Sequence, residues 1–111
     1  MSAAHFGLDN LVVIMDCNGI QLDGFTKDIL DMGDVAAKWT AFGWNTVEID
    51  GHDMGQILDA FDQARSAKGK PTAIVANTVK GKGVSFMENN PGFHGVAPTA
   101  DEVEQALAEL A

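Results

Sequence analysis

Short apolar runs alternate with longer amphipathic stretches along the chain, and this alternation predicts its elements. Residues 11–15 and 72–76 are almost wholly apolar, whereas residues 46–50 (TVEID) alternate polar and apolar positions and form another short strand that lies between them in the chain. Runs of this length without strict polar alternation are typical of strands covered on both faces of a parallel sheet. We therefore predict an α/β fold with three layers, in which helices flank a short, mostly parallel sheet.

Helical spacing predicts a helix between the strands at residues 11–15 and 46–50. Val35, Trp39 and Phe42 recur at that spacing. Asp34 lies near the start, and Gly43 stands where a left-handed residue ends a helix. We interpret Trp39 and Phe42 as core residues, because large aromatic side chains at helical spacing usually pack inside.

Two further helices are indicated by capping boxes. Asp53 with Gln56, and Thr99 with Glu102, have the spacing of a capping box, in which the first residue caps the helix and the side chain three residues later bonds back to it. The first of these helices is predicted to end at Gly69. Its predicted apolar face consists of Met54, Ile57, Leu58, Phe61 and Ala64.

Two segments lack a regular pattern. Residues 84–98 have no period and contain glycine, proline and His94, and long irregular loops in small domains are often functional. Residues 1–7 fit either a leader without structure or the tail of a helix, and the pattern leaves both interpretations open.

Composition bounds the class of protein. The chain has 111 residues, which suits one domain over 1–111, and it carries 16 acidic against 7 basic residues for a net charge of -9. This balance disfavours binding to nucleic acid or to anionic membranes. Cys17 is the one cysteine and no membrane span is visible, so we expect a soluble cytoplasmic protein.

Polar clusters follow the predicted strands, and they are the candidate site. They are Asn18 to Gln21, Lys80 to Gly83, and His94-Gly95. Ends of parallel strands share one rim of a sheet, where open α/β folds bind ligands. Convergence there would combine oxygen ligands for a cation, a lysine for phosphate and a histidine that can donate hydrogen bonds or shuttle protons.

Each cluster also has a simpler interpretation. An Asn-Gly pair after a strand is usually an ordinary turn, and Lys-Gly-Lys-Gly is usually a solvated turn that does not match a P-loop. His52, at another strand-to-helix junction, is interpreted as forming an orienting hydrogen bond in its turn. The sequence has no HExxH, CxxC or GxSxG motif, which argues against zinc and serine-hydrolase chemistry.

Four ordered segments resemble a known family. They read DNLVVIMDCNGIQLDG, AFGWNTVEIDGHD, KGKPTAIVANTVKGKG and SFMENNPGFHGVAP. They are similar to the amino-terminal, thiamine-diphosphate-binding domain of transketolase, especially the split bacterial form in which that domain is a separate subunit. The resemblance covers the chain from Ala3 onward and corresponds to the carboxyl-terminal portion of that domain.

The resemblance implies a function and a site. The family transfers a two-carbon ketol unit between sugar phosphates in the pentose phosphate pathway, with thiamine diphosphate and magnesium as cofactors. It implies that Asn18 gives a side-chain oxygen to Mg²⁺ and that Ile20 gives its backbone carbonyl. Lys80 is implied as a cofactor contact, and His94 as a catalytic residue close to the cofactor and the sugar.

This sequence also lacks parts of the family pattern. The family motif begins with Gly-Asp-Gly, farther upstream of the asparagine than this chain extends, so its magnesium-binding aspartate has no counterpart here. We therefore expect a chain that is inactive alone, and that self-associates as a homo-oligomer or binds a partner carrying complementary transketolase segments. Two alternatives stay open: a non-catalytic remnant or assembly module with this fold, and a fragment of deoxyxylulose-phosphate synthase.

Overall fold

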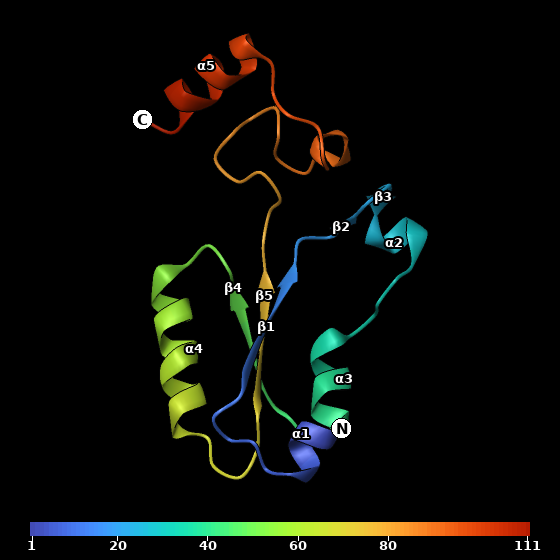
Figure 1. Ribbon diagram of the computed structural model, residues 1–111, viewed down its shortest axis with the longest axis vertical. Helices are drawn as coiled ribbons and strands as arrows, with labels where there is room; N and C mark the ends of the chain where they lie inside the picture. The colour runs from blue at the N-terminus through green and yellow to red at the C-terminus, as the bar shows by residue number, and fades with distance from the viewer. The chain divides into compact units, whose positions relative to one another are not determined.

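The chain divides into two units in the computed structural model, which describes all residues from Met1 to Ala111. Unit 1 consists of Met1–Cys17 and Met32–Thr78, and unit 2 consists of Asn18–Asp31 and Val79–Ala111. Figure 1 shows the elements of both units with the labels used below. None of the helices is long and apolar enough to cross a membrane.

Unit 1 is built on a three-stranded sheet. The strands are β1 (Val12–Cys17), β5 (Thr72–Asn77) and β4 (Asn45–Asp50), in the spatial order β1-β5-β4. Both neighbouring pairs are parallel, which confirms the predicted sheet. The register aligns Cys17 with Asn77 and Asp50 with Asn77, so the three carboxyl ends lie together.

Helices cover the two faces of this sheet. Trp39 of α3 (Val35–Ala41) donates its indole N–H to the Met15 sulfur, whereas α4 (Met54–Ser66) packs on the face that presents Ile14. Adjacent residues of a strand point to opposite faces, so α3 and α4 lie on opposite sides of the sheet (Figure 1). A short helix, α1 (Ser2–His5), precedes β1.

The core of unit 1 lies between β5, β4 and α4. Ile74, Ile49, Ala60 and Ala76 are buried there. Partly buried side chains of Val12, Val47, Ile57 and Phe61 surround them. The central strand β5 is buried from Thr72 to Ala76, as expected for a strand with a neighbour on each side and a helix layer over it.

The core assignment of Phe42 from helical spacing is wrong, because its side chain is 53% exposed. Two members of the predicted apolar face of α4, Met54 and Leu58, are also 66% and 64% exposed. The α4 face that meets the sheet instead centres on Ala60 and Ala64, because small residues let the helix approach the strands closely. Trp39 is half-buried and packs edge-on against Trp44 with ring centroids 4.7 Å apart.

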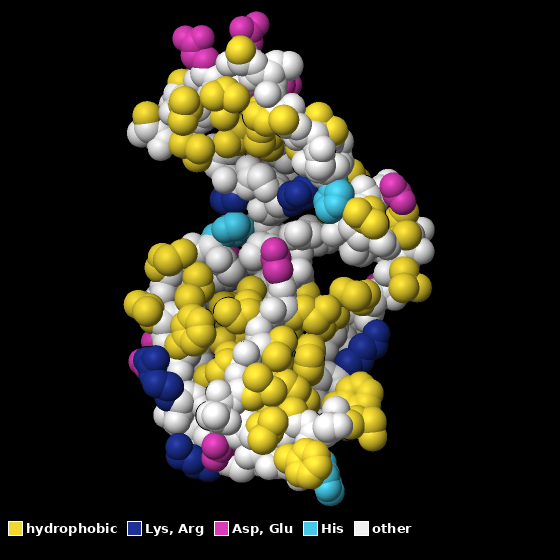
Figure 2. All heavy atoms as spheres, viewed as in Figure 1, with side chains coloured by type: hydrophobic (Ala, Val, Ile, Leu, Met, Phe, Trp, Pro, Cys, Tyr) yellow, Lys and Arg dark blue, Asp and Glu magenta, His cyan; other side chains and the backbone are white.

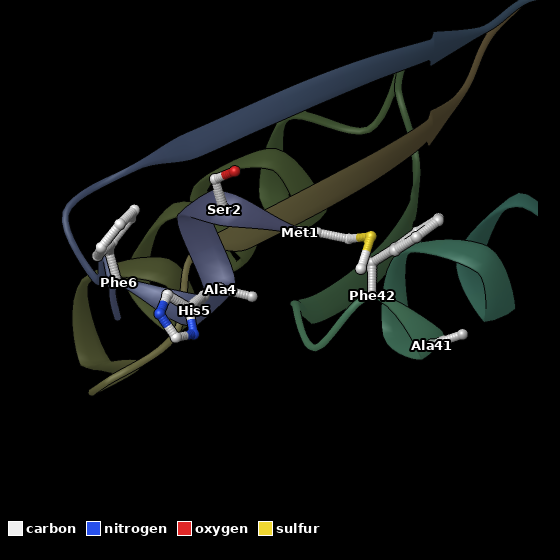
Figure 3. Close-up of a pocket in the computed structure, with 7 residues that line it drawn as sticks. All are labelled: Met1, Ser2, Ala4, His5, Phe6, Ala41 and Phe42. Atoms are coloured by element: carbon white, nitrogen blue, oxygen red, sulfur yellow. The ribbon is translucent and has the colours of Figure 1, made fainter.

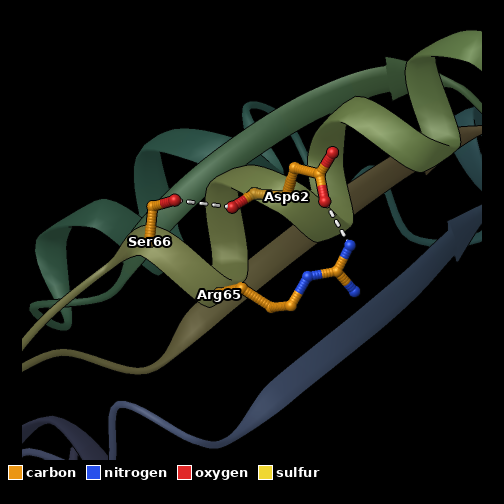
Figure 4. A network of polar contacts seen from close by, with 3 residues as sticks. All are labelled: Asp62, Arg65 and Ser66. Carbon is orange, nitrogen blue, oxygen red and sulfur yellow. Dashed lines mark hydrogen bonds and ion pairs between the residues drawn. The ribbon is translucent and has the colours of Figure 1, made fainter.

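The ends of α4 differ from the prediction in detail. Asp53 accepts a hydrogen bond from the Gln56 backbone N–H, but the Gln56 side chain accepts from the Asp50 backbone N–H instead of completing the capping box. The helix ends at Ser66, before Gly69, and the Ser66 hydroxyl donates to the Asp62 carbonyl. Figure 4 shows this bond beside the ion pair between Asp62 and Arg65.

Unit 2 contains two very short strands, an irregular segment and a longer terminal helix. The strands β2 (Ile20–Gln21) and β3 (Gly24–Phe25) form a two-stranded antiparallel ribbon, and α2 (Thr26–Ile29) follows. The ribbon was not predicted, since each strand is only two residues long. The long irregular segment contains one 3-10 turn, η1 (Pro91–Phe93), and the predicted capping box of Thr99 and Glu102 begins α5 (Ala100–Glu109).

Candidate site after the strand ends

The carboxyl edge of the unit 1 sheet is polar. Thr78 donates its hydroxyl to the Asp16 carboxylate, and the Asn77 amide donates to Glu48 at 2.9 Å. Burial raises the pKa of the Cys17 thiol, and the carboxylates of Asp16 and Glu48 raise it further. Cys17 therefore stays protonated near neutral pH and is not an activated nucleophile.

Asn18 begins the first connection out of this edge. Its side-chain Oδ1 accepts a hydrogen bond from the Ile20 backbone N–H at 3.0 Å, which is an Asx turn. Gly19 allows this turn because its φ is +70°, and the Gly19 carbonyl accepts from the Thr26 N–H at 2.9 Å. The turn holds Ile20, which is buried, at the start of the β2–β3 ribbon.

Lys80 and Lys82 have different surroundings. The Lys82 ammonium lies 3.6 Å from the Glu88 carboxylate, and the same carboxylate accepts from the Gly83 backbone N–H at 3.0 Å. Lys80 has no such partner for its ammonium group. Lys80 is therefore the lysine of this turn whose charge is available to an anion.

His94 follows η1 directly. Its backbone N–H donates to the Pro91 carbonyl at 2.9 Å, and its side chain is exposed. Asn18, Ile20, Lys80 and His94 all belong to unit 2, and among them the one hydrogen bond is the Asx-turn bond from Ile20 to Asn18. The four predicted site residues thus share a unit without forming a network that includes Lys80 or His94.

The residues present fit a diphosphate better than a magnesium ion. No group of three or more His, Cys, Asp or Glu side chains could hold a metal ion. The predicted metal ligands, Asn18 and Ile20, offer only neutral oxygens, whereas Mg²⁺ usually takes one or two carboxylates beside phosphate. The magnesium site is therefore incomplete within these residues, while the unpaired ammonium of Lys80 suits a phosphate group.

A hollow in unit 1 has no set of groups that would bind a phosphate or a metal ion. It has a volume of about 550 Å³ and is formed by α1 together with Ala41 and Phe42 at the end of α3. Figure 3 shows the Met1 side chain pointing toward the Phe42 ring. His5 is the one titratable side chain among its lining residues, so this hollow lacks a set of groups for catalysis.

Sequence reasoning missed the role of Glu88. A signal was present, because Glu88 is the one acidic residue of the polar loop from 80 to 94. Neither a helix nor a strand brings side chains at this sequence separation from Lys82 into contact, so only the folded loop shows which lysine Glu88 neutralises.

Comparison with known proteins assigns the class and the family. The model of a family described as "Transketolase, thiamine diphosphate binding domain" matches residues 1–111. The fold and these matched residues define a thiamine-diphosphate-binding α/β domain. The chain belongs to the transketolase family.

Individual relatives agree with this assignment. The chain is 46% identical over 110 residues to one subunit of the apulose-4-phosphate transketolase of Actinobacillus succinogenes, and the match covers 99% of this chain and 40% of that protein. It is 43% identical over 110 residues to the 6-deoxy-6-sulfo-D-fructose transketolase subunit SqwG of a Clostridium species, with the same coverage. This chain thus spans about 40% of the length of these relatives.

Solved structures agree as well. Transketolase from Leishmania mexicana matches with a TM-score of 0.89 and 29% identity, over 97% of this chain and 16% of that chain. A transketolase from Pichia stipitis in complex with sedoheptulose-7-phosphate matches with a TM-score of 0.88 and 32% identity, again over 97% of this chain and 16% of that chain. The predicted resemblance and fold class are confirmed.

Proposed function

We propose that this chain supplies part of the site of a transketolase that transfers a two-carbon ketol unit between sugar phosphates. Thiamine diphosphate would provide the carbanion-stabilising chemistry when bound, with Mg²⁺ at its diphosphate. The observation that carries the proposal is the unpaired ammonium of Lys80, in a chain whose whole length matches the thiamine-diphosphate-binding family.

The resemblance to the family suggests the proposed roles, and the local geometry is compatible with them. Lys80 would place a positive charge against the diphosphate, since its neighbour Lys82 is already paired with Glu88. His94, exposed at the end of η1, would donate a hydrogen bond to the sugar or move a proton. Asn18 and the Ile20 carbonyl would be metal ligands only where another segment supplies a carboxylate.

Calorimetry with matched lysine variants tests the proposal. Thiamine diphosphate and Mg²⁺ are titrated into the wild-type chain, Lys80→Ala and Lys82→Ala, with and without the complementary transketolase polypeptide. We expect Lys80→Ala to weaken binding about tenfold or more, because a charged contact to phosphate is lost, while Lys82→Ala changes it little. Asn18→Ala should reduce the dependence of binding on Mg²⁺.

The same titration separates the alternative class. A non-catalytic remnant or assembly module would bind no cofactor at any concentration, even with the complementary polypeptide present. Equal losses in Lys80→Ala and Lys82→Ala would contradict the proposed role of Lys80, since they would indicate a general effect of net charge.

We also propose that the partner of this chain is a polypeptide corresponding to the remainder of the relatives' length. Unit 1 has an open sheet edge at β1. The carbonyls of Leu11 and Cys17 accept hydrogen bonds from the β5 side, so the backbone groups of Val12, Ile14 and Asp16 point away from the sheet. An edge of this kind accepts another strand.

The sheet face beside this edge is apolar and only partly covered. A groove of about 280 Å³ is lined by residues of β1, β4, β5 and α4 and the turns that follow the strands: Ile14, Asp16, Ile49, Gly51, Ile57, Phe61, Ile74, Ala76 and Thr78. Ile14 is 57% exposed although it lies in the middle of a strand. Figure 2 shows hydrophobic side chains gathered on the face of unit 1 toward the viewer.

The groove and the free edge together indicate which kind of segment would bind there. A strand pairing with β1, followed by a helix with an apolar face, would satisfy the backbone groups and cover Ile14. A second copy of this chain is the less favourable occupant, because each copy carries a net charge of -9. A homo-oligomer is therefore an outcome that the experiment must distinguish.

Sedimentation with matched substitutions tests the surface. We expect Ile14→Asp to abolish the complex with the complementary polypeptide, since it places a carboxylate in the apolar groove beside Asp16. Leu58→Asp is the control, because Leu58 is similarly exposed but is absent from the groove. Self-association of the wild-type chain that Ile14→Asp abolishes would show instead that a second copy occupies the groove.

A further inference from the structure

The loop from Lys80 to Asn89 is closed on itself. The Asn89 backbone N–H donates to the Lys80 carbonyl at 3.0 Å, and Gly81 lies against Met87 so closely that a Cβ on Gly81 would be 2.6 Å from the Met87 carbonyl oxygen. Asn89 adopts a φ of +52°, the one positive value outside glycine. We call residues 80–89 the lysine loop.

The residues that carry His94 form a second small structure. Phe93 and His94 donate their backbone N–H groups to the carbonyls of Asn90 and Pro91, at 3.3 and 2.9 Å. We call residues 91–94 the histidine turn. No hydrogen bond joins the side chains of Lys80 and His94, so their relative position depends on what links the lysine loop to the histidine turn.

Asn90 stands between the two and bonds to both. Toward the lysine loop, its backbone N–H donates to the Met87 carbonyl and its side-chain Nδ2 donates to the Phe86 carbonyl, each at 3.1 Å. Toward the histidine turn, its side-chain Oδ1 accepts from the Gly92 N–H at 2.9 Å, and its carbonyl accepts from Phe93. Both ends of a half-buried amide are thus used, one on each side.

One apolar contact supports the same link. The rings of Phe86 and Phe93 pack with centroids 5.5 Å apart, so the lysine loop and the histidine turn also meet through side chains. Ring packing is only weakly directional, so this contact alone does not fix the orientation of the two segments. Hydrogen bonds are directional, so an amide that donates to one segment and accepts from the other does fix it.

We propose that Asn90 is a positioning residue that holds His94 in a fixed geometry relative to Lys80. The inference rests on the proposed function for the roles of those two side chains. Its consequence is that an anion bound by Lys80 is presented to His94 without a search by a mobile loop, which lowers the entropic cost of binding.

Three variants separate this role from general loss of structure. Asn90→Ala removes both side-chain bonds. Asn90→Asp keeps an acceptor for the Gly92 N–H but replaces the donor to Phe86 with a carboxylate oxygen that the carbonyl repels. Asn10→Ala is the matched control, because the exposed Asn10 side chain makes no hydrogen bond.

The measurement is nuclear magnetic resonance of the full chain, with inorganic pyrophosphate as the probe. In the wild-type chain and in Asn10→Ala we expect pyrophosphate to shift the Lys80 side-chain and His94 ring signals with one common Kd. In Asn90→Ala and Asn90→Asp we expect the His94 response to disappear and the Kd to rise about fivefold. The near-ultraviolet circular dichroism of Trp39 and Trp44 checks that unit 1 stays folded.

Amide hydrogen exchange distinguishes failure of this inference from failure of the proposed function. Asn90→Ala should speed exchange at Gly92 about tenfold or more, while Asn90→Asp keeps Gly92 protected, since its acceptor remains. Wild-type responses to pyrophosphate in Asn90→Asp would overturn the positioning role. Exchange as predicted, without any response of the wild-type chain to pyrophosphate, would support the link by Asn90 and overturn the roles of Lys80 and His94.

Discussion

At the scale of single residues, the two lysines of the turn Lys80-Gly81-Lys82-Gly83 differ in their surroundings although each is followed by a glycine. Glu88 binds Lys82 and the Gly83 backbone, so the first lysine alone keeps an unpaired charge. This difference depends on Gly81, because the chain passes the Met87 backbone at a distance that no side chain would permit.

Gly81→Ala should therefore destabilise the lysine loop more than a positive φ alone explains. A Cβ there would lie 2.6 Å from the Met87 carbonyl oxygen, so the backbone must shift, and we expect a cost of about 2 kcal/mol. Gly95→Ala is the control, with a φ of +84° and open space around its Cβ position. Urea unfolding followed by amide signals of unit 2 measures both. Equal destabilisation would contradict the importance of the Met87 contact.

At the scale of elements, α5 is tied to the loop before it through one carboxylate. Glu109 near the helix end accepts from the backbone N–H and the hydroxyl of Ser85 and from the Gln105 side chain. These bonds lower the pKa of Glu109, the Ser85 backbone bond most of all. A carboxylate with a lowered folded-state pKa stabilises the fold above its unfolded pKa, and this contribution is lost as the pH falls through the folded value.

Acidification should consequently release α5 from Ser85. We expect the Ser85 amide resonance of the wild-type chain to be constant above the ordinary Glu109 value of 4.5 and to move toward its unbonded position at lower pH. Glu109→Gln should abolish this transition, since its side chain does not titrate. A Ser85 transition that persists in Glu109→Gln would assign the effect to another carboxylate.

At the scale of the whole molecule, the apolar core is divided unequally between the two units. Unit 1 contains eight of the buried apolar residues: Trp44, Ile49, Ala60, Ala64, Ala73, Ile74, Val75 and Ala76. Unit 2 contains two, Ile20 and Val84. Because buried apolar area is the main favourable term in folding, we expect the unit that carries the predicted site residues to be the less stable one.

Unit 2 should open at lower denaturant than unit 1. We expect amides of 79–111 to exchange through an opening reached at lower urea than the unfolding reported by Trp39 and Trp44 fluorescence. Bound thiamine diphosphate should shift the first transition and leave the second nearly unchanged, since its proposed contacts lie in unit 2. A single transition for both probes, with and without the cofactor, would contradict this order.

Local pattern predicted most of the regular structure. Strand lengths, the parallel sheet, the Asp34, Asp53 and Thr99 caps and the left-handed Gly43 all follow from short-range rules. The exposure of Phe42, the rotated face of α4 and the hydrogen bond of the Gln56 side chain could not be predicted in this way, because each depends on which groups lie next to the residue in the folded chain.

The sequence by itself determined the parallel sheet and the polar turns after its strands, because these are encoded within a few neighbouring positions. Through the resemblance of four ordered segments it also determined the family and the candidate residues Asn18, Ile20, Lys80 and His94. Only the tertiary structure decided which lysine keeps a free charge, that Asn90 joins the two halves of the long loop, and that Ile14 borders an open groove. Those features depend on contacts between residues with no fixed spacing, and such contacts exist only once the chain has folded.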